Sequence, residues 1–573
     1  MKHIRTDILI LGAGGAGLFA ALHAQQANPQ LHITVVVKGL LGKCGCTRMV
    51  QGGYNVALAP GDSVERHFMD TIEGGKWLPD QDLAWTLVNG AVLRIHELEN
   101  ELGCFFDRNP DGTIHQKAFA GQTFDRTVHK GDLTGIEIMN RLSEQVWARG
   151  IHRLEEHRAL DFVRAADGAL AGALLVDIRT GDYVFAQAKA VLLATGGGPT
   201  MYRFHTPSGD KSCDGLAMAL RAGLPLRDME MVQFHPTGLL AGAHTRMTGT
   251  VLEEGLRGAG GHLLDGAGQR FMDRYDAKGE RATRDIVSRA IDAEMRAGRT
   301  TPNGGVWLSM GHLGADNVRR QFKGMVERCA DCGFDLAAGR VEVVPTAHYM
   351  MGGVEFAPDC TTECPGLFVA GEDSGGVHGA NRLGGNGVAN STVFGGIAGD
   401  TMAAWLARDG AWREPAAAGL AAARARAEAP FAGSGADAGA LEALRERLYA
   451  TMWDDAGIVR DAAGLARAGR ALREMAAQMA AIAAPGGGAR AFNLAWHDWL
   501  NLDNLIGVSR AIVHAAEARR NSRGAHCRSD FPDAGDLPTS TYTRVRQDES
   551  GGLEVVHAPV RFTRAAPPDR GHA

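Results

Sequence analysis

The stretch TDILILGAGGAGLFAAL, residues 6–22, decides the fold. Residues 6–11 are a short apolar run rich in strand-forming side chains, residues 12–17 are dominated by glycine, and residues 18–22 are again apolar. This order predicts a strand, a tight turn and a helix. A second strand is expected at residues 32–37, at the distance that a βαβ unit requires. The sequence therefore predicts an α/β fold built on a parallel sheet.

Three glycines of the predicted turn, Gly12, Gly14 and Gly17, match the pattern G-x-G-x-x-G. Glycine allows the backbone to turn tightly, and the free N–H groups of the following helix attract the phosphates of a dinucleotide. The alternative is a simple tight turn without a ligand. The strand before the pattern and the helix after it favour nucleotide binding.

The type of nucleotide is narrowed by a missing acid. No Asp or Glu occurs between Asp7 and Asp62, so the carboxylate that usually holds the ribose of NAD is absent. A flavin whose ribose is held in another way stays open. A second glycine turn, ATGGG at residues 194–198, follows an apolar strand at residues 190–194 and offers another backbone surface for such a cofactor.

The composition is that of a folded protein with several domains. The 573 residues exceed the roughly 250–300 at which a single core stops growing. Hydrophobic residues make up 45% and charged residues 22%, which argues against a disordered or fibrous chain. The formal net charge of −6 gives no reason to expect nucleic acid as a partner. No uncharged apolar stretch reaches the roughly 18 residues needed to cross a bilayer, so we expect a cytoplasmic protein without a membrane span.

Nine cysteines are spread thinly along the chain, unlike a secreted disulfide framework. Cys329 and Cys332, together with Cys360 and Cys364, are four thiols that could in principle hold zinc or an iron–sulfur cluster. The spacing of the second pair is loose, and buried free cysteines are common. We therefore expect no metal site in this chain.

Glycine turns and helical patterns predict a discontinuous nucleotide-binding domain. Apolar strands at residues 190–194 and 367–370 both run into glycine-rich turns, whereas between about residues 241 and 345 the glycine turns thin out, as in an inserted domain. From about residue 409 the composition shifts towards alanine and arginine, and amphipathic helices are expected. The predicted parts are a nucleotide-binding domain at residues 1–240 and 346–408, a capping domain at 241–345, a helical domain at 430–528 and a tail at 529–573.

A series of short segments carries a family resemblance over nearly the whole chain. The segments are QGG (51–53), FAGQ (119–122), DLTG (132–135), ATGG (194–197), DG (214–215), QFHPTG (233–238), EGLR (254–257), RFM (270–272), TRDIVSR (283–289), HYMMGG (348–353), HGANRLGGN (378–386) and NSRGAH (521–526). In order and number they resemble the flavoprotein subunits of succinate dehydrogenase and fumarate reductase and the related L-aspartate oxidases. The resemblance implies a Rossmann-like FAD-binding domain with an inserted α+β capping domain and a C-terminal helical domain.

The resemblance also implies FAD as the cofactor, bound across the two glycine turns. Glu372 is expected near the ribityl chain or the ring, and Asp214 near the adenosine. The residues expected to bind FAD are Gly12, Gly14, Gly15, Gly17, Lys38, Cys46, Thr47, Gln51, Gly52, Gly53, Ala194, Thr195, Gly196, Asp214, Glu372 and Asn386.

In this family a small carboxylate lies flat against the flavin ring, and the residues that match its carboxylate ligands are His235, His348 and Arg382. Arginine offers two parallel donors to one carboxylate, and histidines can donate to the other. Without the resemblance, His235 before Pro236 is better explained as a structural histidine of a turn. Phe119 completes the expected substrate site.

Arg284 matches the proton donor of the family. Guanidinium is a weak acid, but hydride addition beside a carboxylate creates a very basic carbanion that it can protonate. Glu254 and Asp285 are expected to return the proton to Arg284. The charge pattern of residues 283–289 by itself would indicate only a solvated helix face with salt bridges.

One departure from the family pattern concerns the attachment of the flavin. Membrane-bound succinate dehydrogenases bond the flavin to a histidine five residues before Gln-Gly-Gly, and Cys46 occupies that position here. A histidyl bond is thereby excluded. We expect noncovalent FAD, with a thioether to Cys46 as the alternative. Loss of the covalent bond favours reduction of an alkene, or oxidation of an easier donor, over oxidation of succinate.

The other departure is Glu253, where the family has a threonine that donates to a substrate carboxylate. A carboxylate at this position would repel another one. Three arrangements avoid the repulsion: Glu253 is protonated, it turns away from the substrate, or it faces an amino or hydroxyl group.

The resulting hypothesis is an FAD-dependent oxidoreductase of CH–CH groups, similar to fumarate reductase and succinate dehydrogenase. It would transfer a hydride between flavin N5 and a small (di)carboxylate and exchange electrons with an iron–sulfur subunit, through which it could lie at the inner membrane. One alternative is oxidation of an amino dicarboxylate, as in L-aspartate oxidase. Another is a non-catalytic electron-transfer module, which would have no need for Arg284, His235, His348 and Arg382 together.

Overall fold

The computed structural model describes residues 1–242, 245, 247–432, 438–483 and 488–568. The first βαβ unit forms where the sequence predicts it: β1 (Lys2–Leu11), α1 (Gly15–Ala27) and β2 (Ile33–Val37). Gly12 in the turn has a positive φ of 111°, and a Cβ at this position would lie 2.1 Å from the carbonyl oxygen of Ala194. Only glycine fits there, because the two glycine turns touch through their backbones.

The central sheet has the strand order β6-β2-β1-β9-β8-β7, and β16 also pairs with β9. Its further strands are β6 (His152–Glu155), β7 (His157–Arg164), β8 (Leu170–Asp177), β9 (Tyr183–Leu193) and β16 (Leu367–Val369). β1 pairs in parallel with β2 and β9, and β16 returns from far along the chain to pair in parallel with β9. The sheet is therefore assembled from two distant parts of the chain.

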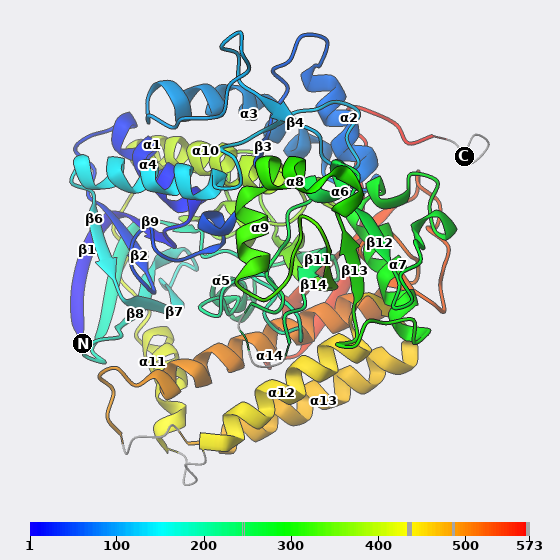
Figure 1. The fold of residues 1–573 in the computed structure, drawn as a ribbon. Coiled ribbons are helices and arrows are strands. Elements are labelled where there is room, and N and C mark those ends of the chain that lie inside the picture. Colours follow the sequence, from blue (N-terminus) through cyan, green and yellow to red (C-terminus); the bar gives the residue numbers. More distant parts are fainter. Residues whose placement is uncertain (243–244, 246, 433–437, 484–487, 569–573) are drawn as a thin grey trace.

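Further helices belong to this part of the molecule. They are α2 (Val64–Gly74), α3 (Gln81–Asn100), α4 (Thr134–Ala148), α5 (Asp214–Arg221) and α10 (Asn386–Asp409). α1 and α10 cross closely (Figure 1), which is possible because α10 has glycines at the contact. A Cβ on Gly395 would lie 2.6 Å from the carbonyl oxygen of Ala16, and one on Gly399 would lie 2.4 Å from that of Ala20. Short elements complete this part: η1 (Cys46–Met49), β3 (Tyr54–Asn55), β4 (Gln116–Lys117), β5 (Thr127–Val128) and η5 (Gly371–Asp373).

The inserted cap is an antiparallel sheet, β11-β14-β13-β12, covered by helices. Its elements are β11 (Val232–Leu239), α6 (Gly255–Gly258), β12 (His262–Leu264), η2 (Met272–Arg274), η3 (Gly279–Arg281), α7 (Arg284–Arg296), β13 (Val306–Ser309), η4 (Gly311–Leu313), α8 (Ala315–Gln321), α9 (Lys323–Ala330) and β14 (Arg340–Met350). A separate core, from Leu239 to Val343, holds the cap together. β11 lies before residue 241 and β14 continues past residue 345, so the cap sheet reaches beyond the predicted range 241–345. The domain limits stay a prediction.

The C-terminal part is helical and ends in a hairpin. Its elements are α11 (Ala417–Ala432), α12 (Ala438–Asp455), β17 (Val459–Arg460), α13 (Ala462–Ala481), α14 (Leu494–Ala518), β18 (Cys527–Arg528), β19 (Thr541–Gln547) and β20 (Leu553–Pro559). The hairpin joins a sheet with β10 (Leu226–Arg227) and β15 (Gly353–Val354). Buried Arg519 pairs with Asp228 and Glu230 near the start of the cap. These elements confirm the predicted fold class, with α12, α13 and α14 along one side of the molecule (Figure 1).

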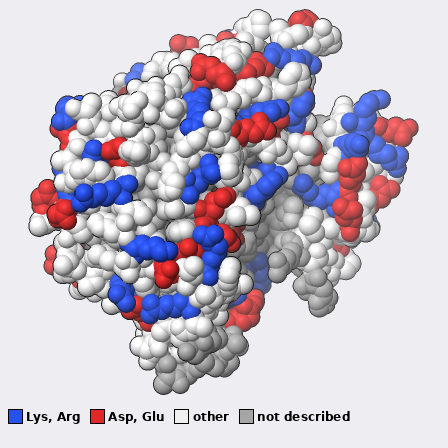
Figure 2. All heavy atoms as spheres, turned by 90° about the vertical axis from the view of Figure 1, so that its left-hand side faces the viewer, with Lys and Arg blue, Asp and Glu red and all other residues white. Residues whose placement is uncertain are grey.

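The surface in Figure 2 carries basic and acidic side chains mixed together. Within the described ranges, no helix combines the length and the apolar character that crossing a membrane requires.

Candidate active site

A cavity is lined by residues of both the FAD-binding domain and the cap. Most of the residues predicted from the sequence line it. On the cofactor side these are Gly14, Gly15, Cys46, Thr47, Gln51, Gly52, Gly53, Ala194, Thr195, Gly196 and Glu372; on the substrate side they are Phe119, His235, Glu253, Glu254, Arg284, His348 and Arg382. The structure thus brings the predicted cofactor and substrate residues around one space.

Two helix N-termini open towards the cofactor side. Gly14 before α1 and Gly385 before α10 supply no side-chain cap, and Gly15 and Gly387 line the cavity. The N–H group of Gly15 donates to Thr47 Oγ1 at 3.1 Å. Helix N-termini favour negative charge, so the residues present fit the pyrophosphate and the ring of FAD.

Two buried carboxylates border this side. Glu372 Oε1 accepts from the N–H groups of Met350 (2.9 Å) and Gly198 (3.3 Å), and burial raises its pKa. Burial also raises the pKa of Asp373 to about 6, although it accepts from the N–H group of Gly196 at 2.8 Å. Asp373 was missed by the sequence reasoning, although it directly follows Glu372.

A second, smaller cavity of about 630 Å³ lies beside the first glycine turn and is lined by Gly12, Lys38 and Asp214. Asp214 pairs with Lys38 Nζ at 2.9 Å and with Arg158 Nη2 at 2.6 Å. Burial alone would raise the pKa of Asp214, but the two cations hold it well below its usual range. Its position near the adenosine of FAD stays a prediction.

Two other predicted cofactor residues do not line either cavity. A Cβ on Gly17 would lie 2.0 Å from the carbonyl oxygen of Gly12, so this glycine allows the tight turn. The side chain of Asn386 is bonded within the protein, to Asn55 at 2.9 Å, His67 at 3.0 Å and Thr71 at 3.1 Å. Asn386 therefore holds the start of α10 through its side chain.

His235 and His348 lie on the neighbouring strands β11 and β14, with ring centroids 5.3 Å apart. Burial and the nearby Arg284 keep the pKa of both rings well below the usual value, so both are neutral. His235 Nδ1 accepts from the N–H group of Thr237 at 3.3 Å. Its Nε2 therefore carries the proton and can donate to a ligand.

Arg382 is a buried cation without a carboxylate partner among the described residues. Its guanidinium lies 4.4 Å above the ring of Tyr349, and its Nε has no hydrogen-bond partner in the described part of the chain. Burial and the nearby Arg284 lower its pKa to about 10. Such a group remains cationic at neutral pH and is stabilised by an anionic ligand. We call Arg284 and Arg382 the arginine wall of the cavity.

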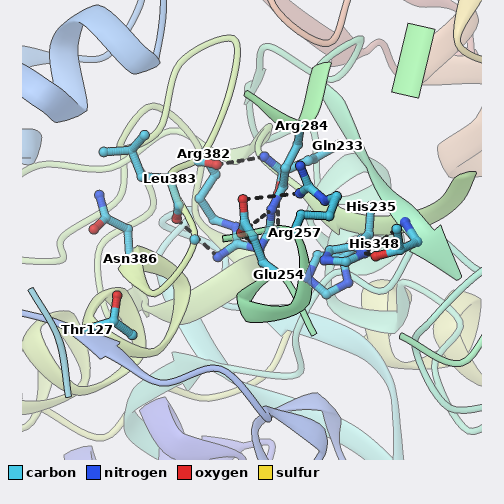
Figure 3. A network of polar contacts seen from close by, with 12 residues as sticks. Thr127, Gln233, His235, Glu254, Arg257, Arg284, His348, Arg382, Leu383 and Asn386 are labelled. Carbon is cyan, nitrogen blue, oxygen red and sulfur yellow. Dashed lines mark hydrogen bonds and ion pairs between the residues drawn. The ribbon is translucent and has the colours of Figure 1, made fainter. Parts of the chain in front are cut away.

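Arg284, Glu254 and Arg257 form a buried chain of ion pairs (Figure 3). Arg284 opens α7, where the helix dipole disfavours a cation, and its Nη2 donates to Glu254 Oε2 at 2.7 Å. Arg257 Nη2 donates to the other oxygen of Glu254 at 3.3 Å. Burial alone would raise the pKa of Glu254, but the two arginines bring it below its usual value. Gln233 Oε1 accepts from Arg284 Nη1 at 3.0 Å and fixes its direction.

Asp285 lies outside this chain. Its carboxylate accepts from the hydroxyl of Thr283 and from Arg289 Nη2 at 3.3 Å, on the far side of the helix start. Arg257 takes the place that was predicted for Asp285. The sequence did contain a signal for Arg257, because residues 254 and 257 have the i, i+3 spacing that places two side chains on one face of a helical turn.

Glu253, the neighbour of Glu254, has different surroundings. It is 4% exposed, and its Oε2 pairs with Lys117 Nζ at 3.2 Å. Lys117 belongs to β4 of the FAD-binding domain, whereas Glu253 belongs to the cap. Burial raises the pKa of Glu253, although Lys117 opposes this. No sequence pattern indicated this pair, because its members lie far apart in the chain.

Cys46 lines the cavity as a thiol, because burial raises its pKa to about 12. The thiolate is the nucleophilic form, so this environment favours noncovalent FAD over a thioether. Cys329 lies in the core of the cap, and Cys360 and Cys364 lie in the main core. Within the described ranges, no three His, Cys, Asp or Glu side chains form a candidate metal site.

Comparisons with known proteins agree with this geometry. The family model described as "FAD binding domain" matches residues 7–388, and the one described as "Fumarate reductase flavoprotein C-term" matches residues 445–572. One subunit of the fumarate reductase (CoM/CoB) of Methanothermobacter marburgensis is 39% identical, over 92% of this chain and 94% of the relative. The 8-methylmenaquinol:fumarate reductase flavoprotein subunit of Wolinella succinogenes is 35% identical, over 96% and 90%.

A solved structure extends the likeness to the whole fold. A variant of the Escherichia coli quinol:fumarate reductase flavoprotein FrdA superposes with a TM-score of 0.93 at 32% identity, covering 100% of this chain and 99% of that one. The chain therefore belongs to the succinate dehydrogenase and fumarate reductase flavoprotein family and is an FAD-dependent oxidoreductase acting on CH–CH groups.

Proposed function

We propose that this enzyme works as a reductase of a small unsaturated carboxylate whose C=C bond is conjugated to the carboxyl group. The observation that carries the proposal is the buried chain Arg284–Glu254–Arg257, which opens on the cavity beside the unpaired Arg382. A cation without a carboxylate partner in the described part of the chain and a proton-carrying chain beside it are the two parts that such a reduction needs.

Arg382 binds the carboxylate through its guanidinium, and His235 adds a neutral donor. Both groups withdraw electron density from the double bond and hold the substrate in one orientation. FAD, when bound and reduced, supplies the hydride. Closure of the cavity by the cap keeps water away from the reacting carbons.

Arg284 protonates the carbon next to the one that receives the hydride. A proton from solvent then restores the guanidinium by way of Glu254 Oε2, which accepts from Arg284 Nε at 3.0 Å and Nη2 at 2.7 Å. Arg257 stabilises the carboxylate form of Glu254 between turnovers. The roles of these residues are the part of the proposal that mutation tests most directly.

The relatives are named as subunits, which supports a separate electron-transfer partner. We propose an iron–sulfur subunit in this role, through which the chain could also lie at the inner membrane. The names of the two relatives contain different compounds, CoM/CoB in one and 8-methylmenaquinol in the other. The final electron donor of the present enzyme is therefore left open by the relatives.

The proposed direction is tested with anaerobic holoenzyme reduced by dithionite. Adding fumarate or its monoamide should restore the yellow absorption of oxidised flavin within a few turnovers. Failure of both acids to reoxidise the flavin would contradict the proposal.

Glu253 gives a specific reason to include a second candidate, oxidation of an amino dicarboxylate, because a carboxylate in the cavity could face an ammonium group. Bleaching of the oxidised flavin by L-aspartate, without bleaching by succinate, would favour this second function.

A further inference from the structure

We infer that Glu253 determines the substrate class of the cavity, which takes a carboxylate at the arginine wall and a hydrogen-bond donor, such as an amide, hydroxyl or ammonium group, at Glu253. The inference rests on the proposed function and deepens it. It names a monocarboxylate with a donor at its far end as the preferred substrate, in place of a dicarboxylate.

The first observation is that Glu253 and the arginine wall have different ion-pair partners: Glu253 pairs with Lys117, whereas Arg284 pairs with Glu254. The charged groups that act most strongly on the pKa of Glu253 are Lys117, Asp132 and Arg328. Arg284 and Arg382 instead act on each other and on Glu254. Glu253 therefore lines the same cavity as the arginine wall but belongs to a separate group of charges.

The second observation is that Glu253 lines the cavity, whereas its ion-pair partner Lys117 does not. Lys117 Nζ is held by Glu253 Oε2 at 3.2 Å and by the carbonyl oxygen of Gly131 at 3.3 Å. Within the described residues, no hydrogen bond reaches Glu253 Oε1. Glu253 is thus a lining residue with one carboxylate oxygen that accepts no hydrogen bond from the described part of the chain.

These two observations decide between kinds of substrate. A second substrate carboxylate beside Glu253 would bring two anions into one buried site, where one of them would have to take up a proton. An amide, hydroxyl or ammonium group would instead donate to Glu253 Oε1 in a charge-assisted hydrogen bond. A site built around such a bond discriminates strongly, because an unsuitable ligand leaves a buried polar group unpaired.

The decisive comparison uses succinate and its monoamide, succinamate, which have the same shape and differ in the charge and donors of one end. The dissociation constant of each is measured with oxidised holoenzyme through the change in flavin absorbance. We expect the wild-type enzyme to bind succinamate at least about tenfold more tightly than succinate. Glu253→Gln should reduce this preference about tenfold or more, because the amide of glutamine can donate to a carboxylate as well as accept from an amide.

Two further variants sharpen the result. Glu253→Thr is expected to reduce the preference for succinamate as Glu253→Gln does. It allows the same measurement if the glutamine variant loses FAD. Asp132→Asn is the matched control, because Asp132 acts on Glu253 from outside the cavity lining. This variant should retain the preference for succinamate. An equal affinity of the wild-type enzyme for both ligands, unchanged in Glu253→Gln, would overturn the inference.

A measurement on the wild-type enzyme alone adds an independent test. Lowering the pH protonates Glu253, which faces Lys117 on β4, Asp132 before α4 and Arg328 on α9. The affinity of the wild type for succinate should then rise relative to its affinity for succinamate. Protonation of succinate itself also changes this ratio, and Glu253→Gln measures that part at the same pH. The change in the wild type should be the larger of the two. A preference that stays constant with pH would count against Glu253.

Binding to oxidised enzyme does not depend on turnover, so the two proposals can fail separately. If neither fumarate nor its monoamide reoxidises the reduced flavin, the proposed reduction is wrong, while the binding ratio still measures the role of Glu253. If fumarate and its monoamide are both reduced, and the ratio of the dissociation constants of succinate and succinamate is the same in Glu253→Gln as in the wild type, the proposed reduction stands and the inferred substrate class is wrong.

Discussion

Glu253 and Glu254 are adjacent in the chain and both are buried, yet they belong to two different regions of the cavity. Glu254 lies among Arg284 and Arg257, which bring its pKa below the usual value despite burial. Glu253 has Lys117 as its ion-pair partner, and burial raises its pKa. The number of cations within reach, more than burial itself, decides which glutamate is a stable anion and which one is poised to gain a proton.

The difference also has a structural cause. The partners of Glu254 come from the cap, where residues 254 and 257 share one helical turn and α7 delivers Arg284. The partner of Glu253 comes from the other domain. The ion-pair chain around Glu254 is thus built within the cap, whereas the ion pair of Glu253 joins the cap to the other domain.

The largest effect is expected when Arg284, the proposed proton donor of the arginine wall, is replaced. Arg284→Gln should lower kcat by about 10²–10⁴-fold, the range that general acid catalysis contributes. Substrate reduction is followed by reoxidation of reduced flavin in a stopped-flow instrument. Arg296→Gln, at the exposed end of the same helix, is the matched control and should remain active. Normal turnover by Arg284→Gln would remove this residue from the mechanism.

The next change separates the two acids that were expected to serve Arg284. Glu254→Gln should lower kcat by about 10²-fold or more, because the amide that replaces the carboxylate beside Arg284 cannot take up and return a proton. Asp285→Asn should cost less than about tenfold, because Asp285 contacts Thr283 and Arg289. The measurement is kcat over pH 6–9 with one substrate. Equal losses in the two variants would contradict the chain seen here.

The stability of the protein should respond to pH in opposite ways at the two glutamates. The lowered pKa of Glu254 stabilises the fold above the ordinary carboxyl range, and this contribution is lost as the pH falls through the lowered value. The raised pKa of Glu253 gives stability that is present in acid and is lost as the pH rises through the raised value. A tenfold difference in proton affinity corresponds to about 1.4 kcal/mol.

The check is urea unfolding of the wild type, Glu253→Gln and Glu254→Gln at several pH values. Relative to the wild type, Glu254→Gln should be most destabilising at neutral pH, and Glu253→Gln should become less destabilising, or even stabilising, as the pH rises. Parallel curves for the two variants would show that their surroundings do not differ as described.

The smallest effect is expected at Cys46, an uncharged group that lines the same cavity. Cys46→Ser should change neither the FAD content nor the release of yellow FAD when the protein is precipitated with acid, because the wild-type cofactor is expected to be noncovalent. A fluorescent protein band on a denaturing gel of the wild type, absent in Cys46→Ser, would instead demonstrate a thioether.

Much of the fold could be predicted, because short-range patterns dictate it. The apolar run before Gly12 and the glycines after it specify β1, the turn and α1. The residues of the cavity were also found, since family motifs identify positions in a chain. What the motifs could not supply was the direction of side chains: Asp285 directly follows Arg284, yet its carboxylate faces Arg289.

The pair of Lys117 and Glu253 shows a second limit of sequence reasoning. β4 and the start of α6 meet only after the cap has folded onto the FAD-binding domain, and no local pattern encodes that contact. For the same reason Asn386 was expected at the cofactor, while its side chain is satisfied by Asn55, His67 and Thr71. Long-range partners decide what a polar side chain is free to do.

The return of β16 to β9 has a consequence for the biosynthesis of the molecule. Neither the central sheet nor the α1–α10 layer can be completed before residues up to Asp409 have left the ribosome, whereas the cap has a core that ends at Val343. Distant pairing of this kind slows folding, so the cap should become resistant to protease first on chains stalled at increasing lengths. The part of the protein that is synthesised first would then be among the last to reach its final structure.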